Sequence, residues 1–295
     1  MGANIEVFPA GFLNIDKPKG WTSFDVVARL RKITGVRQIG HTGTLDPFAT
    51  GVLPVCIGKT TRLIEYLSDD KQYVATVQFG KNTDTYDIDG NITEIFDKKV
   101  RKEEILDCLK NFEGEILQLP PIYSAIKKDG KKLYEYARAG ESVEITPRKV
   151  FIKKVSLVEF DEEYQVAKIE VECSAGTYIR SIAYDLGKSL CCGGYLSELR
   201  RTKTGRFCIE DSIELDRIKT IEDAKSAIVK PVEALDKPIM ELSETEAGRI
   251  SHGMYIKNKS YKNSDIVILV YNGKIHGVGL VDNNKILAKK VFEVL

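Results

Sequence analysis

The order in which strand-like and helical patterns follow one another most constrains what this chain can fold into. Residues 73–79 alternate apolar and polar side chains as a half-buried strand does, whereas residues 103–112 place apolar side chains at helical spacing. Two long strand-like runs, 149–160 and 165–173, come next, and 179–190 again has helical spacing. Because a regular strand–helix repeat is missing, we expect an α+β fold with a mixed, mainly antiparallel central sheet.

The first helix has signals at both ends. Residues 12–16 read as a strand that stops at a turn, and Thr22 then stands where a helix would begin. Asp25 follows three residues later, a spacing typical of a capping box. Gly35 is the predicted end of the helix. The apolar residues predicted to share its buried face are Val26, Val27, Leu30 and Ile33.

The C-terminal part of the chain reads as a separate, β-rich unit. A helical piece, 244–250, precedes three strand-like runs, and Asn272-Gly273 between the first two runs is a strong hairpin signal. We therefore expect a large domain over residues 1–231 and a small β barrel over residues 232–295. The length of 295 residues is enough for both domains to bury a core.

Composition narrows the class of protein. No apolar run approaches the roughly 18 residues that cross a bilayer, and residues 1–10 lack the pattern of a signal peptide. None of the six cysteines belongs to a C-x-x-C pair, which is typical of small buried residues in a reducing compartment, so we expect a cytoplasmic protein. The net charge of +1 means that a nucleic-acid partner would need basic residues concentrated on one face.

Two common kinds of site are not favoured. Gly58-Lys59-Thr60 suggests a phosphate loop, but Leu53 stands where such a loop needs a glycine. No His/Cys cluster has metal-ligand spacing, because the three histidines are far apart in the sequence. We therefore expect neither an NTPase loop nor a metal site.

Three segments are candidates for chemistry, and each has a simpler alternative. The glycine- and proline-rich residues 40–54 hold Asp46, either in a surface turn or in a loop that presents a nucleophilic carboxylate. Residues 176–180 offer a tyrosine to stack on a base and Arg180 to pair with a carboxylate, or they are simply a helix start. The basic residues in 199–203 suit phosphate contacts, but also a solvated surface.

Taken together and in order, these segments resemble the tRNA pseudouridine synthase B (TruB) family. The resemblance covers about residues 12–207, and its motifs are specific because they occur in register. The motifs are FLNIDKPKGWTS (12–23), GHTGTLDPFATGVLP (40–54), DKQY (70–73) followed by Gly80 and TDTYD (83–87), PPIYSAIK (120–127), GTYIR (176–180) and LRR (199–201). The tail is similar, more weakly, to a PUA domain, which is a small RNA-binding β barrel.

The resemblance implies a pseudouridine synthase fold with an inserted thumb at about residues 122–147, followed by a PUA-like domain. It also implies a reaction, the conversion of uridine 55 in the T-loop of tRNA to pseudouridine. The bond from ribose to uracil N1 is broken, the base turns, and C5 is joined to the ribose. Nothing is added or lost, so neither a cofactor nor a metal is expected. The expected partner is the T-arm of tRNA, with no membrane, no obligate protein partner and a monomeric enzyme.

The same resemblance implies roles for individual residues. Asp46 matches the nucleophile, and attack at uracil C6, attack at ribose C1′ and a glycal route all stay open. Arg180 matches the arginine that pairs with this aspartate and keeps it ionised despite burial. Tyr73 matches the aromatic residue that stacks on the uracil and is a candidate for proton transfer. The other matched substrate-binding positions are His41, which fills the space left by the flipped nucleotide, Tyr178 and Leu199, which line the base pocket, and the phosphate contacts Lys127, Arg200 and Arg201.

Two other functions stay open. An RNA chaperone would use the same surface to help tRNA fold without chemistry, although Asp46, Tyr73 and Arg180 argue against a purely non-catalytic protein. A guide-RNA-dependent synthase subunit would share the catalytic motif and work within a ribonucleoprotein. The lysine- and tyrosine-rich thumb favours the stand-alone enzyme, because it supplies RNA contacts within one chain.

Overall fold

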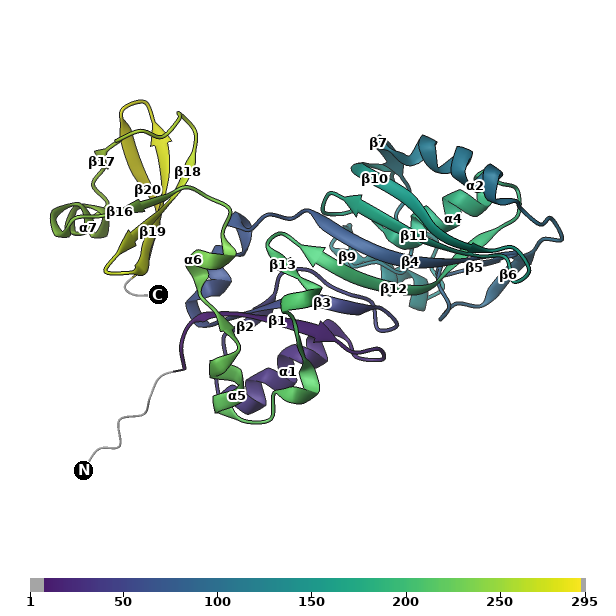
Figure 1. The fold of residues 1–295 in the computed structure, drawn as a ribbon, viewed down its shortest axis with the longest axis horizontal. Coiled ribbons are helices and arrows are strands. Elements are labelled where there is room, and N and C mark those ends of the chain that lie inside the picture. The colour runs from purple at the N-terminus through teal and green to yellow at the C-terminus, as the bar shows by residue number, and fades with distance from the viewer. Residues whose placement is uncertain (1–7, 293–295) are drawn as a thin grey trace.

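The computed structural model describes residues 8–292 of the chain (Figure 1). The outer limits of the two expected domains, and most of the N-terminal segment without a signal-peptide pattern, lie outside the described residues. None of the described helices is long and apolar enough to cross a membrane.

The larger part of the chain forms one mixed sheet of eleven described strands. Its main path runs β14-β1-β3-β12-β4-β11-β10-β7, with β2, β13 and β15 beside it. Within this sheet, β1–β14 and β3–β12 are the two parallel pairs among the described strands, and the other pairs are antiparallel, which confirms the mixed, mainly antiparallel α+β fold. The strands are β1 Gly11–Lys17, β2 Ile39–His41, β3 Thr50–Ile57, β4 Lys71–Phe79, β7 Gly114–Gln118, β10 Arg148–Asp161, β11 Val166–Cys173, β12 Gly194–Thr204, β13 Phe207–Cys208, β14 Ile213–Glu214 and β15 Ile228–Val229.

The first helix begins and ends where the sequence predicts. Thr22 caps α1 (Ser23–Thr34), and the reciprocal hydrogen bonds with Asp25 complete the capping box. Gly35 follows with a φ of 71°, a left-handed conformation that suits glycine. The face that α1 buries against the sheet includes Val26, Val27 and Leu30. The sequence patterns are therefore sufficient to place this helix and its contact face.

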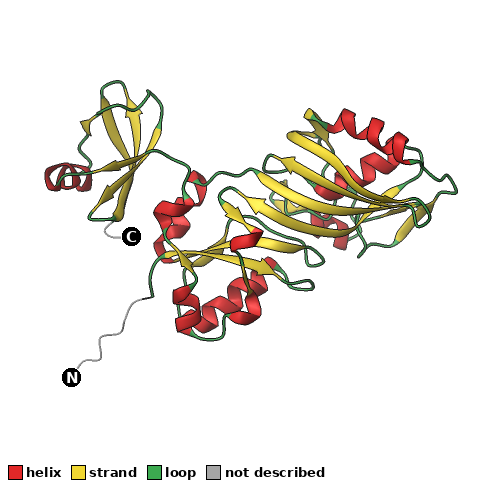
Figure 2. Cartoon of the chain, in the orientation of Figure 1, coloured by secondary structure: helices red, strands yellow, loops and turns green. Residues whose placement is uncertain are grey.

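Helices cover the large sheet in two groups (Figures 1 and 2). α1 and α5 (Ile221–Ser226) lie beside the half that contains β1 and β2, whereas α2 (Lys102–Leu109) and α4 (Ile179–Ser189) pack on the half that contains β4 and β10. Residues 44–46 and 176–180, singled out in the sequence, lie where these two halves meet. The remaining short elements are η1 Gly58–Tyr66, β5 Lys81–Thr83, β6 Ile92–Ile95, η2 Lys110–Phe112, η3 Ile209–Asp211 and η4 Leu215–Arg217.

One central strand differs from the sequence-based expectation. The second half of the glycine- and proline-rich segment forms β3, a buried strand, rather than a turn. Pro54 is tolerated because it lies between the residues of β3 that pair with β2 and those that pair with β12. Gly51 has a φ of 100°, and a Cβ there would clash with the carbonyl oxygen of Arg201. Glycine therefore lets β3 and β12 approach.

The thumb is an excursion between two neighbouring strands. β7 and β10 pair directly, with Gln118 opposite Arg148, so residues 119–147 leave and rejoin the sheet at one place. Within this segment a hairpin of β8 (Lys127–Lys128) and β9 (Lys131–Lys132) leads into α3 (Leu133–Arg138). The Leu133 side chain is buried, and the Leu133 amide donates to the carbonyl of Ile126, which fastens α3 to the start of the thumb.

A second, five-stranded sheet forms a curled half-barrel at the C-terminal end. Asn272 and Gly273 both have positive φ and form the predicted hairpin turn. The order of strands is β16-β18-β19-β20-β17. The elements of this part are α6 Pro231–Ala234, β16 Ile239–Glu241, α7 Glu244–Ser251, β17 Ile256–Lys257, β18 Ile266–Tyr271, β19 Lys274–Asp282 and β20 Lys285–Val291.

The two sheets share apolar contacts. Phe12 and Val52 of the large sheet belong to the same buried cluster as Ile268, Val278 and Phe292 of the C-terminal part. Polar contacts surround this cluster, because Lys290 pairs with Glu65 and Arg62 donates to the Val291 carbonyl over 3.2 Å. The C-terminal sheet is thus packed against the large sheet rather than only tethered to it.

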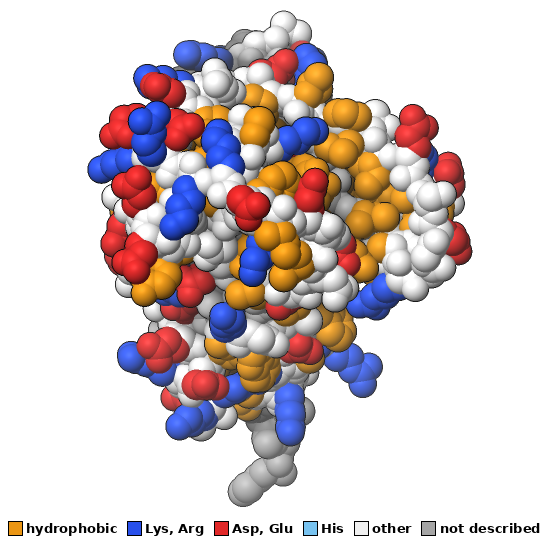
Figure 3. Space-filling view, turned by 90° about the vertical axis from the view of Figure 1, so that its right-hand side faces the viewer, with side chains coloured by type: hydrophobic (Ala, Val, Ile, Leu, Met, Phe, Trp, Pro, Cys, Tyr) orange, Lys and Arg blue, Asp and Glu red, His pale blue; other side chains and the backbone are white. Residues whose placement is uncertain are grey.

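Surface charge is mixed on the side shown in Figure 3. Lysines, arginines and acidic side chains alternate there, and apolar side chains lie between them. The exposed Ile92 and Ile95 of β6 are among the exposed apolar residues of the chain. This side therefore offers no uninterrupted basic surface for a nucleic acid.

Candidate active site

A cavity of about 400 Å³ brings together most of the segments singled out in the sequence. One wall comes from residues 44–46, a second from β4 and Leu199 of β12, and a third from residues 176–180. The thumb closes part of the cavity with residues 123–125 and Tyr134. The cavity is thus lined by residues up to 155 positions apart, since Thr44 and Leu199 both contribute to it.

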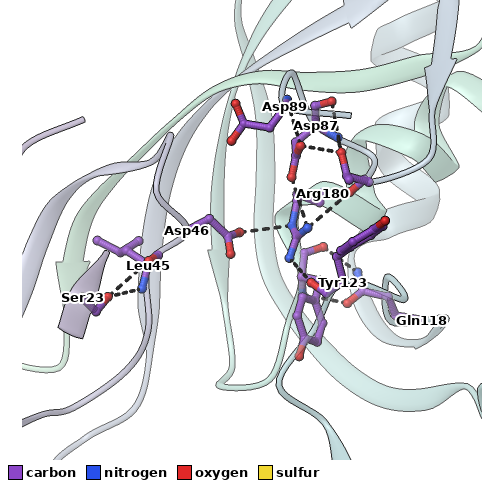
Figure 4. Close-up of polar contacts among 10 residues, drawn as sticks. Ser23, Leu45, Asp46, Asp87, Asp89, Gln118, Tyr123 and Arg180 are labelled. Carbon is purple, nitrogen blue, oxygen red and sulfur yellow. Dashed lines mark hydrogen bonds and ion pairs between the residues drawn. The ribbon is translucent and has the colours of Figure 1, made fainter. Parts of the chain in front are cut away.

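The centre of the cavity is an arginine shared by two aspartates (Figure 4). Nε of Arg180 lies 3.1 Å from Oδ2 of Asp46, and its Nη1 lies 3.1 Å from Oδ2 of Asp87. The second terminal nitrogen of Arg180 donates to the Tyr123 carbonyl over 2.9 Å. Nη1 also donates to the Thr85 carbonyl over 3.3 Å, and only 6% of the Arg180 side chain is exposed, so two carboxylates and two carbonyls replace its hydration shell.

The two aspartates bind this arginine differently. Asp87 is an aligned hydrogen-bond acceptor, whereas the contact of Asp46 is close but lacks hydrogen-bond geometry. About a third of the Asp46 side chain is exposed to the cavity, compared with 5% for Asp87. Among the described residues none donates an aligned hydrogen bond to the Asp46 carboxylate. Asp46 is therefore the more exposed and less constrained carboxylate, whereas Asp87 holds the arginine by an aligned hydrogen bond.

Asp87 is kept in place by its own loop. Oγ1 of Thr85 donates to one carboxylate oxygen of Asp87 over 2.5 Å, and the Asp89 amide donates to the same oxygen over 3.1 Å. Tyr86 adopts a positive φ of 63° and stacks on Tyr184 of α4, with ring centroids 4.1 Å apart. Burial raises the pKa of Asp87, while the hydrogen bond from Thr85 and the charge of Arg180 oppose that shift. The sequence motif 83–87 includes Asp87, but nothing in its spacing indicated a role for this residue.

The loop that carries Asp46 is fixed on both sides. The hydroxyl of Ser23 bonds both to the carbonyl and to the amide of Leu45 (Figure 4). The fully buried ammonium of Lys17 donates to the carbonyls of Pro47 and Trp21, over 3.3 and 2.6 Å. Burial lowers the pKa of Lys17 to about 8, and the nearby charge of Asp46 opposes this shift. The lysine was counted in a turn motif, and its buried position could not be read from the sequence.

The walls of the cavity are suited to a flat base. Tyr73 and Leu199 line the cavity from the paired strands β4 and β12, where Tyr73 lies opposite Arg201 and Leu199 opposite Ala75, and each is 7% exposed. Burial raises the pKa of the Tyr73 hydroxyl, so the neutral phenol is favoured. Tyr178 lies opposite at the start of α4 and is held by Gln118, whose side-chain amide bonds to both the amide and the carbonyl of Tyr178, over 2.7 and 3.0 Å.

Four residues expected to bind substrate do not line this cavity. His41 lies on β2 with a half-buried ring, and burial lowers its pKa. Lys127 is exposed on the thumb hairpin. Arg200 is bound bidentately to Asp16, over 2.7 and 3.2 Å. Arg201 departs most from expectation, because it is 1% exposed and donates to the carbonyls of Val52 and Gly43. It holds the 40–54 segment against β12, and its guanidinium is not available to a phosphate in this structure.

No grouping of three His, Cys, Asp or Glu side chains within residues 8–292 could hold a metal ion. The ionisable side chains that line the cavity are a carboxylate, a buried arginine, a lysine and four tyrosines. Such a set can perform nucleophilic and proton-transfer chemistry on a neutral heterocycle.

Comparison with known proteins decides which family this site belongs to. The model of the N-terminal domain of TruB family pseudouridylate synthases matches residues 31–179, and the model of the tRNA pseudouridylate synthase B C-terminal domain matches residues 180–237. The chain belongs to the TruB family. The resemblance seen in the sequence motifs is thus confirmed, and the chain is an enzyme of the pseudouridine synthase class, an isomerase.

Individual relatives agree with this assignment. A tRNA pseudouridine synthase B of Caldanaerobacter subterraneus subsp. tengcongensis is 43% identical over 286 residues, which are 96% of this chain and 99% of the relative. A tRNA pseudouridine synthase B of Clostridium novyi is 47% identical over 77% of this chain and 79% of its own length. Among solved structures, a chain of a Cbf5-Nop10-Gar1 complex is 28% identical, with a TM-score of 0.73, and the match covers 98% of this chain and 85% of that one.

Proposed function

We propose that this TruB-family enzyme isomerises uridine 55 in the T-loop of tRNA to pseudouridine, with Asp46 as the nucleophile. The observation that carries the proposal is the pairing of a partly exposed Asp46 with the buried Arg180, inside a cavity walled by aromatic and apolar side chains. The relatives' name, tRNA pseudouridine synthase B, supports tRNA as the substrate.

The cavity suggests how the substrate binds. A uridine within a folded T-loop has to leave its stack, at a cost of a few kcal/mol, to reach a carboxylate in a pocket. Tyr73 stacks on the extruded uracil, and Leu199 and Tyr178 complete the base pocket. His41 fills the space that the base leaves in the RNA, and Lys127 and Arg200 lie outside the cavity, where they bind phosphates. For Arg201 we propose a positioning role, since it holds the Gly43 carbonyl near Asp46.

The chemistry then needs only the groups in the cavity. Asp46 attacks uracil C6 or ribose C1′, or removes a proton on a glycal route. The bond between C1′ and N1 breaks, the base turns, and C5 is joined to C1′. C5 then loses its proton, N1 gains one, and Asp46 is released. Arg180 compensates the carboxylate charge before attack and orients the carboxylate. The neutral Tyr73 phenol is close enough to the base to pass a proton to or from it. No atoms are gained or lost.

The decisive experiment replaces Asp46 by asparagine. We expect Asp46→Asn to abolish pseudouridine formation in a T-loop stem-loop while the variant still binds the RNA, because only the nucleophilic charge is lost. Asp107→Asn on the exposed face of α2 is the matched control. Wild-type turnover by the Asp46→Asn variant would show that the nucleophile is another group.

The guide-dependent alternative has some structural support, since one similar solved structure is an H/ACA ribonucleoprotein bound to a substrate RNA, 25% identical with a TM-score of 0.72. We propose a stand-alone, monomeric enzyme instead, because the thumb supplies its own RNA-facing lysines. Purified protein should convert an unmodified tRNA transcript without added guide RNA. Conversion only with a guide RNA present would favour the ribonucleoprotein subunit.

A chaperone role can coexist with catalysis and is separable by experiment. If the Asp46→Asn variant assists tRNA folding as well as the wild type does, folding assistance is independent of chemistry. If neither protein assists folding, the chaperone function is excluded.

We also propose that residues 1–231 form the catalytic domain and residues 232–295 a PUA-like RNA-binding domain. The separate five-stranded sheet supports the division. The cytoplasm is the proposed compartment, and the six free cysteines of the described chain support a reducing one.

A further inference from the structure

Lys71 is a cation of the reaction cavity to which neither the sequence motifs nor the chemistry above gives a task. It is the first residue of β4 and lies two residues before Tyr73, so both side chains leave the same face of the strand. Both side chains line the cavity with Asp46. A Cβ on Gly43 would lie 3.8 Å from Nζ of Lys71, which places the ammonium beside the backbone of the Asp46 loop.

The ammonium of Lys71 has no partner within the described residues, in contrast to the other cations nearby. Arg180 forms ion pairs with two carboxylates and donates to two carbonyls, and Arg201 donates to two carbonyls. No described carboxylate or carbonyl lies within hydrogen-bonding distance of Nζ of Lys71. Burial lowers the pKa of this lysine and the charge of Arg201 adds to that effect, while the charges of Cys173 and Asp69 oppose it. A half-buried cation without a partner is costly, and an anionic ligand would remove the cost.

The position of Lys71 indicates which part of a bound nucleotide it contacts. Tyr73 and Leu199 form the buried wall that suits the base. Lys71 lies at the outer end of β4 and also borders a small hollow formed by residues 67–69 and 204–207. Lys71 therefore lies nearer the opening of the cavity than Tyr73 and Leu199 do. The sugar–phosphate backbone of an extruded nucleotide has to pass through this opening. An ammonium on a flexible stem suits a phosphate oxygen there.

We propose that Lys71 binds a non-bridging oxygen of one of the two phosphates that flank the target uridine. This inference rests on the proposed function, because it assumes an RNA nucleotide in the cavity. The contact fixes the backbone of the extruded nucleotide, so that the base is held against Tyr73 and within reach of Asp46. Lys71 is thus a substrate-binding residue, and it takes no part in bond breaking.

The test combines a protein change with a change of one phosphate in the RNA. T-loop stem-loops are prepared in which one of the two phosphates that flank the target uridine is replaced by a neutral methylphosphonate. The nucleotide that carries this linkage also has a 2′-O-methyl group. The binding of these stem-loops is compared with that of the same RNA with a charged linkage. At one linkage, neutralisation should weaken wild-type binding about tenfold, the size expected for a hydrogen bond to a charged group.

The Lys71→Gln variant should bind the charged RNA about as weakly as the wild type binds the neutral RNA, and neutralisation should weaken it no further. Lys71→Arg should regain most of the affinity, and Lys102→Gln on the exposed part of α2 should behave as the wild type does. On unmodified RNA, Lys71→Gln should raise KM more than it lowers kcat. Thermal melting shows whether Lys71→Gln is folded. If it is not, the effect of neutralising each linkage is compared between Lys71→Arg and the wild type instead.

Two results would overturn the inference. Lys71→Gln could remain as sensitive to neutralisation as the wild type at both linkages, or it could bind the charged RNA with wild-type affinity. Neither result concerns the reaction itself. If the wild-type protein formed no pseudouridine in the unmodified stem-loop, the proposed function would fail instead, so the two failures are distinguishable.

Discussion

At the scale of single residues, the site depends on how one arginine divides its contacts. The Asp46–Arg180 pair was expected from the family motifs, and the structure places the two groups 3.1 Å apart. Asp87 and Gln118 were not expected to matter, because their partners lie 93 and 60 positions away in the sequence. Contacts at such separations depend on the sheet topology, and local patterns carry no information about them.

Asp87 should therefore matter for rate although it does not face the base. In Asp87→Asn the buried arginine keeps only one charged partner, so its guanidinium shifts toward Asp46 and the carboxylate leaves its reactive position. We expect kcat to fall by about 100-fold, as for a misplacement of about 1 Å, with little change in KM. Single-turnover kinetics measure this directly. Asp84→Asn in the same loop is the control, and equal rates for the two variants would contradict the role given to Asp87.

Lys17 should make stability depend on pH in a characteristic direction. Burial lowers its pKa in the folded chain to about 8, from the ordinary lysine value of 10.5 that applies when the chain is unfolded. Between these values the unfolded chain binds the proton and the folded chain does not, so the free energy of unfolding rises with pH. The stability advantage of the wild type over Lys17→Met should therefore be larger at pH 9.5 than at pH 7.5, as measured by urea unfolding. An advantage that stays constant would mean that Lys17 is charged throughout this range.

At the scale of elements, the sequence predicted helices and turns best where contacts between residues close in the chain determine the structure. The capping box of α1 and the Asn272-Gly273 hairpin are set by contacts within four residues, and both were predicted. β3 and β12 were missed for the opposite reason. The glycines and the proline of β3 and the basic run in β12 are typical of loops, and only the neighbouring strands and the buried side of the sheet make them strands.

The thumb is an element that should loosen without unfolding the protein. Leu133 is the buried residue of α3, and its amide donates to the Ile126 carbonyl within the thumb. Leu133→Ala should leave the main thermal transition nearly unchanged and should speed tryptic cleavage after the lysines of β8 and β9. Limited proteolysis with mass spectrometry identifies the sites. Leu106→Ala, at an exposed position of α2, is the control, and cleavage as slow as in that control would show that Leu133 does not hold the thumb.

At the scale of the whole molecule, the shared apolar cluster joins the catalytic sheet to the C-terminal half-barrel. The sequence predicted two units and gave no sign of this interface, because its residues are ordinary apolar positions of separate strands. Phe292 is 1% exposed, and the Arg62 guanidinium lies 4.7 Å from the centre of its ring. We therefore expect the wild type to melt in one calorimetric transition.

Phe292→Ala should separate that transition into two. Removing a buried phenylalanine costs about 3–5 kcal/mol, and here the loss falls on the contact between the sheets. The C-terminal sheet should then melt first, as followed by calorimetry and by hydrogen exchange of β18 and β19. Leu287→Ala, at a partly exposed position of the same sheet, should lower stability only slightly. A single transition in the Phe292→Ala variant would mean that the cluster does not couple the sheets.

The direct pairing of β7 with β10 has a consequence for how such enzymes can diversify. The chain between Gln118 and Arg148 closes at one register pair whatever its length, and loop-closure entropy grows only slowly with length. Recombination or protein engineering can therefore replace much of the thumb by another segment while β7 and β10 stay in place. The limit lies in its first part, because Gln118 holds Tyr178 in the wall of the cavity and the Tyr123 carbonyl accepts a hydrogen bond from Arg180. New RNA specificities can thus be grafted beyond these residues, provided that both contacts are kept.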